Sequence, residues 1–587
     1  MAAEPKRLRI ALAQVNTTVG DIEGNMRLIR EWINRGREAG AQLVMFPEQT
    51  VTGYPAEDLW LKPHFLDAAR RALEQIASEI SGVVAVVGFP EHEAATHNSA
   101  AVLADGGIQA LYRKTLLPNY GVFDERRYFE PGDAPALVEV AEVRVGLTIC
   151  EDIWYPGPPA SVEALAGASL IVNPSASPYH RGKGIFRERM ISNRARETGA
   201  AFAMCNLVGG QDELVFDGHS LVVSSGGETL ARGAQFAEEL VVCDLRLAAR
   251  PPAEAVGATP PVLVRLAAPE PRGEAEPHLA RLLEPDAEVY EALKLGLRDY
   301  VRKNRFERVL VALSGGIDSA LVTLIAADAL GPERVTCVVM PSPHSSDATQ
   351  ADARAIARNV GAGLLEIPIE HAMRAYEELL SRTGDGAVPR AAGPGAGGES
   401  ARETETGGPG AELAAENIQA RIRGNLMMAL SNRFGWLVLA TGNKSEMSVG
   451  YATLYGDMAG GFAVIKDVPK TLVYRLVRYR NRVSEGVLVP ESVLERAPSA
   501  ELRPDQRDED SLPPYEVLDR ILAAYVEEDR GRDEIVADGL PAELVDEVIA
   551  MVDRSEYKRR QAPPGVRITP KAFGRDRRLP ITNRFRG

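Results

Sequence analysis

The chain has 587 residues, of which 45% are hydrophobic and 25% charged, and it carries a net charge of −15. This length predicts two or more domains, and the acidic balance argues against general nucleic-acid binding. Four widely separated cysteines without a CxxC pair exclude a disulfide framework and a cysteine-rich zinc site and favour a cytoplasmic location, and no apolar run reaches the roughly 18 residues of a membrane span.

Residues 1–245 alternate strand-like runs with amphipathic helical segments, which predicts a layered α/β domain. The strand-like runs are residues 8–15, 42–48, 83–89, 143–150, 169–175 and 200–206. Residues 246–285 are rich in Pro, Ala and Glu, a composition that is typical of a linker.

The second domain is predicted over residues 286–587. A helical segment from Pro285 leads into a β-branched run that ends at Ala312, and further strands are expected at 334–341, 364–370 and 436–443. Helical segments between these strands favour a parallel sheet. Residues 381–411 are rich in Gly, Pro and Ala and predict a mobile surface insertion, because they offer little to bury in a core.

Cys150 is the first candidate for chemistry. It ends a run in which Val143, Val145, Leu147 and Ile149 alternate with smaller or polar residues, so it is expected on the face away from the core and exposed. A reactive cysteine requires such exposure and an activating partner, although a lone cysteine also fits a small packed hydrophobe. Glu48 follows an apolar strand and Lys114 lies in a strand-like run, and each fits a surface position as well as a catalytic one.

The segments FPE, YRKTLLP and CED occur in this order and resemble the nitrilase superfamily of carbon–nitrogen hydrolases. This resemblance implies an αββα sandwich and a triad of Glu48, Lys114 and Cys150. Cys150 would attack an amide carbon, Glu48 would carry the proton and Lys114 would stabilise the oxyanion. By the same resemblance, Glu125 has an orienting role, and the residues expected to bind glutamine are Tyr120, Glu151, Ser177 and Lys183.

Residues 311–320, VALSGGIDSA, place two glycines and two serines between a strand and a helix. Hydroxyls, a close backbone approach and a helix N-terminus are suited to a phosphate, but the lysine of a P-loop NTPase is absent. The segment resembles the pyrophosphate loop of the ATP-pyrophosphatase superfamily, which implies a Rossmann-like, doubly wound parallel sheet. In that family the acid, here Asp318, binds Mg²⁺, and ATP is cleaved between its α and β phosphates. A tight turn that caps a helix is the structural alternative.

Residues 416–432 form an amphipathic helical pattern with one apolar stripe, Ile418, Ile422, Leu426 and Leu430. Asn417 and Arg421 share another face, which fits either a solvated surface or a binding site. Glu446 is a plausible second Mg²⁺ ligand or a nucleotide contact.

The motifs ENIQARIR, TGNKSE and GYATLYGD and the C-terminal KRRQAPPGVRITPKAFGRDRRLPITNRFR together resemble the family of glutamine-dependent NAD⁺ synthetases over nearly the whole chain. The implied enzyme is a ligase that takes ATP as co-substrate, Mg²⁺ as cofactor and deamido-NAD⁺ and glutamine as small-molecule substrates. Further expectations are a homo-oligomer formed through the second domain, no nucleic-acid or membrane partner, and a protected path for ammonia. The implied ATP-binding residues are Ser314, Gly315, Gly316, Asp318, Ser319, Thr441 and Lys470; those for deamido-NAD⁺ are Asn417, Arg421, Glu446 and Asp457; and the metal ligands are Asp318 and Glu446.

Two alternatives remain at this point. The first is another adenylating amidotransferase that acts on a different acid, and the acceptor motifs would discriminate it. The second is a hydrolase attached to a nucleotide-sensing module without synthetase activity, against which the intact Asp318 and Glu446 argue.

Overall fold

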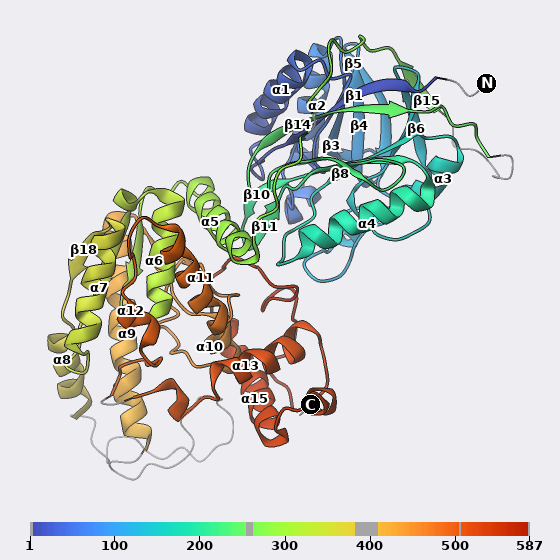
Figure 1. The fold of residues 1–587 in the computed structure, drawn as a ribbon. Helices are drawn as coiled ribbons and strands as arrows, with labels where there is room; N and C mark the ends of the chain where they lie inside the picture. The colour runs from blue at the N-terminus through green and yellow to red at the C-terminus, as the bar shows by residue number, and fades with distance from the viewer. Residues whose placement is uncertain (1–3, 254–261, 277, 382–408, 504–505, 585–587) are drawn as a thin grey trace. The chain divides into compact units, whose positions relative to one another are not determined.

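The computed structural model describes residues 4–253, 262–276, 278–381, 409–503 and 506–584 (Figure 1). The chain divides into two compact units, Met1–Asp299 and Tyr300–Gly587, and each is described by itself. The division falls within helix α5 (Pro285–Lys303), somewhat later than the predicted start of the second domain at residue 286. Most of the predicted insertion, residues 382–408, lies outside the described residues.

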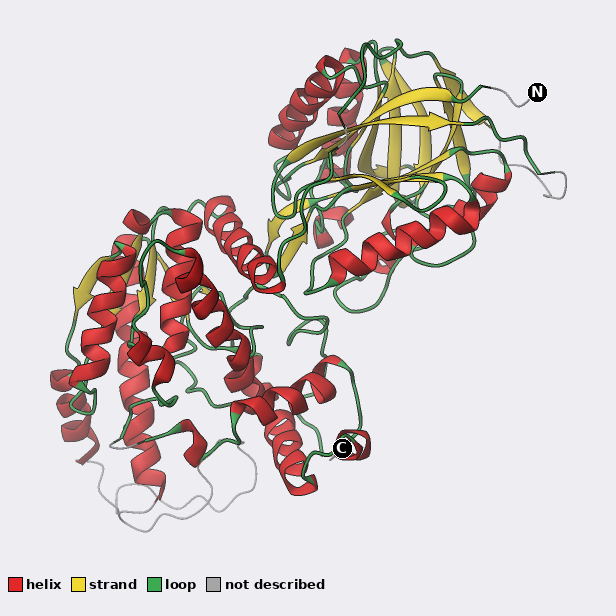
Figure 2. Ribbon diagram, viewed as in Figure 1, coloured by secondary structure: helices red, strands yellow, loops and turns green. Residues whose placement is uncertain are grey.

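Two mixed sheets form the first unit (Figure 2). The six-stranded sheet has the order β14 (Glu239–Leu247), β1 (Lys6–Gln14), β2 (Leu43–Met45), β3 (Val84–His92), β4 (Thr96–Ala104), β5 (Gly107–Arg113). The seven-stranded sheet has the order β13 (Thr229–Arg232), β12 (Leu221–Val223), β9 (Ala201–Asn206), β8 (Leu170–Ser175), β7 (Val143–Leu147), β6 (Ala136–Val140), β15 (Val262–Leu266). A separate hairpin pairs β10 (Val208–Gln211) with β11 (Leu214–Asp217).

The alternation of apolar residues along the strands explains the layers of this unit. On β1, Leu8, Ile10 and Leu12 enter the core between the two sheets, whereas Ala11 and Ala13 face outward onto helices. Helices α1 (Ile22–Glu38) and α2 (Pro63–Glu79) cover the outer face of the first sheet, and α3 (Ala160–Leu165) and α4 (Lys183–Thr198) cover that of the second. The predicted αββα sandwich is therefore confirmed.

Part of the predicted linker 246–285 belongs to this sandwich. Val262–Leu266 forms β15, which runs parallel to β6 at the edge of the seven-stranded sheet and buries Leu266. The short β-branched run lies between Pro-rich stretches, so composition alone did not distinguish it from a linker.

The second unit contains a five-stranded sheet in which every pairing is parallel. Its order is β18 (Gly363–Glu366), β17 (Val335–Val339), β16 (Val309–Ala312), β19 (Leu437–Ala440), β20 (Phe462–Ala463). Leu310, Val338 and Val438 face the helices α8 (Glu370–Ser381) and α9 (Pro409–Phe434). On the opposite face, Cys337 of β17 lies 3.9 Å from Thr323 of α6 (Ile317–Leu330). Helices on both faces confirm the predicted Rossmann-like fold.

Ile422 on α9 is buried, and Ile418, Leu426 and Leu430 pack against the same core, as the helical stripe predicted. The remaining helices of the unit are α7 (Asp347–Val360), α10 (Lys444–Val449), α11 (Lys470–Val483), α12 (Glu491–Glu495), α13 (Tyr515–Leu522), α14 (Arg532–Ala537), α15 (Ala542–Arg554) and α16 (Glu556–Arg559).

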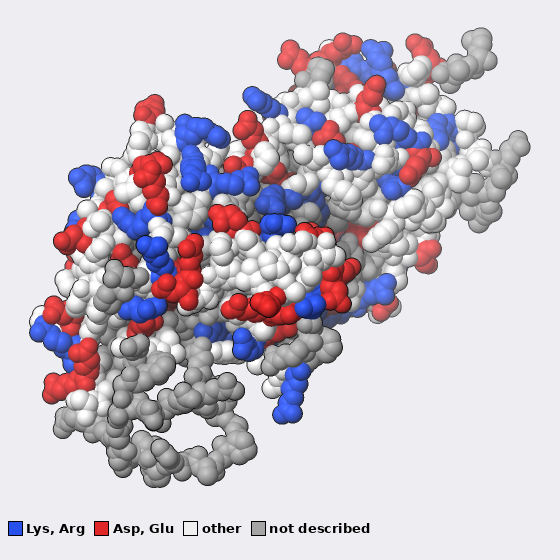
Figure 3. All heavy atoms as spheres, turned by 60° about the horizontal axis from the view of Figure 1, so that its bottom comes forward, with Lys and Arg blue, Asp and Glu red and all other residues white. Residues whose placement is uncertain are grey.

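The basic C-terminal segment, which begins at Lys558, packs against the rest of the second unit. Lys558 Nζ donates to the carbonyl oxygens of Gly450 and Ala452, at 2.9 and 3.1 Å, and Arg559 is buried. On the face that Figure 3 shows, acidic and basic side chains are interspersed. Within the described ranges, no helix is both long and apolar enough to cross a membrane.

Glu163 on α3 provides a test of the first unit's core. Its side chain is fully buried, and burial raises its pKa well above the ordinary value of 4.5. The native state therefore holds this proton while the unfolded state releases it above pH 4.5, so folding stability falls as pH rises, by about 1.4 kcal/mol per pH unit until the native pKa is reached.

We expect Glu163→Gln to remove this dependence. The thermal unfolding midpoint of the variant, relative to the unchanged chain, should rise as the pH increases above 4.5, until the native pKa of Glu163 is reached. Glu38→Gln, at an exposed position, is the matched control and should follow the unchanged chain. Parallel midpoint curves for Glu163→Gln and the unchanged chain would contradict a buried, protonated Glu163.

Candidate active sites

Strand ends bring the predicted triad of the first unit together. Glu48 lies three residues beyond β2, Lys114 directly follows β5, and Cys150 begins a short 3-10 helix, Cys150–Ile153, after β7. These three side chains and that of Glu125 are each at most 2% exposed. The site is thus buried at the ends of strands from both sheets.

Lys114 is the centre of a buried charge cluster. Its Nζ donates to Glu48 Oε1 at 2.7 Å and to both oxygens of Glu125 at 2.8 and 2.9 Å. Asn98 Nδ2 donates to Glu48 Oε1 at 2.7 Å and to Glu125 Oε2 at 3.4 Å, and Tyr54 donates to Glu125 Oε1 at 2.9 Å. The remaining Glu48 oxygen accepts from the backbone of Ala176 at 3.0 Å. Every member of the cluster therefore has a fixed orientation.

The cluster sets the protonation of its members. Burial alone would lower the pKa of Lys114, but the charges of Glu125 and Glu48 raise it well above its ordinary value. Burial raises the pKa of Glu125 to about 7, against the lowering effect of Lys114. Burial and then the charge of Glu48 raise the pKa of the Cys150 thiol well above its ordinary value. The thiol is thus protonated at neutral pH and requires a base before it can act as a nucleophile.

The expectation of an exposed Cys150 was wrong. The strand β7 ends at Leu147, and Cys150 turns back into the core between the sheets with 2% exposure. Its φ of 42° lies in the left-handed region, which a non-glycine residue adopts at an energetic cost. Strand alternation could not predict this side-chain direction, because the strand stops before the cysteine.

The predicted glutamine-binding residues lie on three segments: the loop after β5, the 3-10 helix Cys150–Ile153, and residues 177–183. Tyr120 donates to both carboxylate oxygens of Glu151, at 2.9 and 3.0 Å, and the residue is 51% exposed. Lys183 Nζ donates to the carbonyl of Pro178 at 2.7 Å and lies 5.1 Å from the ring centroid of Trp154. The buried Oγ of Ser177 has no hydrogen-bond partner within the described structure, which leaves it available to a ligand.

Sequence reasoning missed Tyr54 and Asn98. Asn98 lies on β4, whose run of small and polar residues gave no strong strand signal, and Tyr54 lies in the loop after Glu48. Their function became visible through contacts with Glu48 and Glu125.

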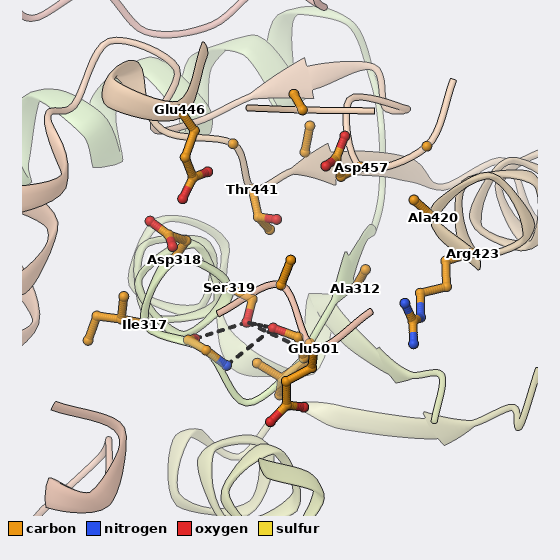
Figure 4. Close-up of a pocket in the computed structure, with 18 of the residues that line it drawn as sticks. Ala312, Ile317, Asp318, Ser319, Ala420, Arg423, Thr441, Glu446, Asp457 and Glu501 are labelled. Atoms are coloured by element: carbon orange, nitrogen blue, oxygen red, sulfur yellow. Dashed lines mark hydrogen bonds between the residues drawn. The ribbon is translucent and has the colours of Figure 1, made fainter. Parts of the chain in front are cut away.

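The phosphate-loop segment of the second unit connects β16 to α6. Gly315 has a φ of 86°, and the backbone N–H of Gly316 donates to Ser314 Oγ at 3.2 Å. Ser319 Oγ donates to the carbonyl of Gly316 at 3.1 Å and accepts from the backbone of Ser314 at 3.2 Å (Figure 4). The loop opens onto a cavity of about 320 Å³, which Thr441, Glu446, Asp457 and Lys470 also line.

Asp318 and Glu446 point toward each other at one side of this cavity (Figure 4). Lys470 Nζ donates to Asp318 Oδ2 at 2.6 Å and to Glu446 Oε1 at 2.8 Å. The two carboxylates raise the pKa of Lys470 although burial opposes this, and burial raises the pKa of Glu446 to about 7. The structure therefore brings two predicted carboxylates together around the buried ammonium of Lys470, a third predicted site residue.

Asn417, Arg421 and Asp457 converge on the turn at residues 453–457. Asn417 Oδ1 accepts from Thr453 Oγ1 at 2.9 Å, Arg421 Nε donates to the carbonyl of Leu454 at 3.2 Å, and Asp457 Oδ1 accepts from the backbone of Thr453 at 2.8 Å. Asp457 lines the cavity. Asn417 and Arg421 are not among the described residues that line the cavity.

Three further residues were missed from the sequence. Arg423 lines the cavity opposite Asp318 (Figure 4), donates from Nε to the carbonyl of Met340 at 3.1 Å, and has its pKa lowered to about 10 by burial. Asn443 Nδ2 donates to Asp318 Oδ1 at 2.9 Å. Lys444 is buried and donates to Glu527 and to Thr569 of the C-terminal segment, at 2.8 and 2.6 Å. A signal for the last two existed in TGNKSE, where polar residues directly follow a buried strand.

Comparisons with known proteins cover both units. A carbon–nitrogen hydrolase family model matches residues 9–252, and an NAD synthase model matches residues 289–562. The glutamine-dependent NAD(+) synthetase of Thermotoga maritima is 46% identical over 594 residues, which cover 99% of each chain. The protein of the same name from Aquifex aeolicus is also 46% identical, over 98% of this chain and all of its own.

The chain belongs to the family of glutamine-dependent NAD(+) synthetases.

A solved structure of a member of this family, from Acinetobacter baumannii in complex with ADP, is similar with a TM-score of 0.72 and 39% identity. It covers 98% of this chain and 99% of its own. A family member from Cytophaga hutchinsonii, at 22% identity and a TM-score of 0.78, supports the fold.

The two loop glycines offer a matched pair of substitutions. A Cβ at Gly315 would collide with the carbonyl oxygen of Thr349, and the φ of 86° disfavours any side chain. Gly316 has a φ of −86°, and its Cβ would lie 3.3 Å from Ser314 Oγ. The fold therefore requires a glycine at 315, whereas the glycine at 316 leaves room for a ligand.

We expect Gly315→Ala to destabilise the second unit by at least about 1 kcal/mol, seen as a lower unfolding midpoint. Gly316→Ala should keep the midpoint and weaken ATP binding, measured by calorimetry, by about 1 kcal/mol or more, because the backbone can no longer approach a phosphate closely. Equal midpoints for the two variants would refute this division of roles.

Proposed function

We propose that this protein makes NAD⁺ by ATP-dependent amidation of deamido-NAD⁺, with nitrogen released from glutamine in the first unit. Family membership over the full chain carries this proposal, and the carbon–nitrogen hydrolase and NAD synthase regions fit the two half-reactions. The products are NAD⁺, AMP, pyrophosphate and glutamate.

In the first unit, the Cys150 Sγ attacks the amide carbon of glutamine and forms a thioester. Glu48 takes the thiol proton and delivers it to the departing ammonia, and it then activates the water that releases glutamate. Lys114, held between Glu48 and Glu125, stabilises the oxyanion, and Glu125 orients the lysine. The raised pKa of the buried thiol supports this assignment, because a protonated nucleophile needs an adjacent base.

Glutamine binding is assigned to the residues around the mouth of this site. The hydroxyl of Tyr120, the carboxylate of Glu151 and the unpaired Oγ of Ser177 are suited to the polar end of an amino acid. Lys183 supplies a cation near Trp154 that is suited to the substrate carboxylate.

In the second unit, the loop Ser314–Gly316 with Ser319 receives the ATP phosphates at the N-terminus of α6. Thr441 and Lys470 contact the nucleotide, and Asn417, Arg421, Glu446 and Asp457 bind deamido-NAD⁺. The nicotinate carboxylate displaces pyrophosphate from the α phosphate, and ammonia then displaces AMP from the adenylated acid. Adenylation is needed because a free carboxylate is a poor electrophile at neutral pH.

Mg²⁺ is assigned to Asp318 and Glu446. Within the described residues, no cluster of three or more His, Cys, Asp or Glu side chains is arranged as a metal site. Two converging carboxylates nevertheless fit Mg²⁺, which proteins commonly hold through one or two carboxylates together with substrate phosphates. Bound there, the metal would neutralise the polyphosphate.

The nucleophile is tested by Cys150→Ala. We expect glutamine-dependent NAD⁺ formation to fall by about a thousandfold or more, while formation from ammonium stays within about twofold of the unchanged chain, because the synthetase chemistry does not use this thiol. Liquid chromatography of NAD⁺ measures both rates. Cys243→Ala, another buried cysteine of the same unit, should retain both activities. Loss of the ammonium reaction in Cys150→Ala would contradict two separate sites.

A homo-oligomer through the second unit is also proposed. Tyr376 and Leu379 on α8 are 44% and 60% exposed, and Leu364 on the edge strand β18 is 39% exposed. An exposed apolar edge is typical of an interface.

Sedimentation velocity tests this surface. Leu379→Glu should shift the protein to a smaller species, since a carboxylate would have to be buried at the interface. Val487→Glu is the control, because Val487 is 65% exposed and lies outside α8 and β18. An unchanged sedimentation coefficient for Leu379→Glu would place the interface elsewhere.

A further inference from the structure

Lys470 occupies the point on which the two proposed metal ligands converge. Its Nζ lies 2.6 Å from Asp318 Oδ2 and 2.8 Å from Glu446 Oε1, and its side chain is 4% exposed. One ammonium thus bridges the two carboxylates.

The carboxylates do not depend on Lys470 alone for their positions. Asn443 is fully buried, and its Nδ2 donates to Asp318 Oδ1 at 2.9 Å. Its Oδ1 accepts from the backbone of Glu446 at 3.0 Å and caps helix α10. One side chain therefore joins the Asp318 carboxylate to the helix that carries Glu446, and this link does not involve the ammonium.

The ammonium and a metal ion compete for this position. A divalent cation between Asp318 and Glu446 would lie close to the charge of Lys470 in a buried site, where repulsion between like charges is strong. Lys470 begins α11 and lines the same cavity as the loop at Ser314–Gly316. Its flexible four-carbon stem allows the ammonium to turn toward a phosphate that enters this cavity.

We propose that Lys470 is an internal cation that keeps free Mg²⁺ off Asp318 and Glu446 until the nucleotide phosphates take its ammonium. Metal and nucleotide then bind with positive coupling, and by linkage each strengthens the other by the same factor. This inference rests on the proposed assignment of Asp318 and Glu446 as metal ligands.

The test is Mn²⁺ binding to the full chain, measured by electron paramagnetic resonance, with and without an ATP analogue that carries a methylene group between its α and β phosphates. In the unchanged chain, the analogue should tighten Mn²⁺ binding by about tenfold or more. Lys470→Met should bind Mn²⁺ about tenfold or more tightly than the unchanged chain without the analogue, and the coupling should largely disappear.

Two control variants test whether the effect depends on the positive charge of residue 470 and on its position in the cavity. Lys470→Arg retains the cation. Without the analogue, this variant should bind Mn²⁺ as weakly as the unchanged chain does. Lys466→Met removes a cation from the same cavity, where Lys466 Nζ donates to the carbonyl of Pro563 at 3.0 Å, and should leave Mn²⁺ binding without nucleotide as it was.

The unchanged chain alone can overturn the inference, whether or not Lys470→Met folds. If Mn²⁺ binds equally well with and without the analogue, Lys470 does not exclude the metal. Glu446→Gln separates this failure from failure of the metal site. If that variant loses Mn²⁺ binding in the presence of the analogue, the site stands and the coupling result decides the role of Lys470. If Mn²⁺ binding is unaffected by Glu446→Gln, the metal lies elsewhere and both assignments fall.

Discussion

Two carboxylates that lie side by side away from bulk water repel each other unless a cation or a shared proton lies between them, and in both candidate sites a lysine supplies the cation. Lys114 joins Glu48 to Glu125 in the first unit, and Lys470 joins Asp318 to Glu446 in the second. Without the ammonium, the two carboxylates of each site would repel each other unless one of them took up a proton. Each lysine therefore balances the charge of the two acids beside it.

An asparagine contacts each of these two clusters of one lysine and two carboxylates. Asn98 donates to both glutamates of the first site, and Asn443 donates to Asp318 while it caps the helix that carries Glu446. An amide suits this position because it offers directed hydrogen bonds without adding charge to a buried cluster. Asn98 thus helps to orient both glutamates of the first site and Asn443 helps to orient Asp318, while the lysines add charge and further hydrogen bonds.

The two lysine–carboxylate clusters are suited to different reactions because the groups around them differ. The first site is closed around a thiol whose proton is held by burial, which fits a reaction that begins with proton transfer to Glu48. The second opens onto a cavity beside a glycine loop and a helix N-terminus, which fits a polyanionic substrate. The two functions are thus distinguished by how open each cluster is to a ligand and by its neighbours, a thiol in the first site and a glycine loop in the second.

The sequence by itself determined the two α/β domains, the positions of the strands that precede Glu48 and Asp318, and the stripe of α9, because periodicity and strand-end polarity are local properties. It could not determine the direction of Cys150, since the left-handed backbone there breaks the alternation of β7. It also passed over Asn98 and Asn443, whose function lies in contacts with residues 27 and 125 positions away along the chain. Only the tertiary structure decided that Lys470 bridges Asp318 and Glu446, because burial and convergence of charges are properties of the packed chain and have no period in the sequence.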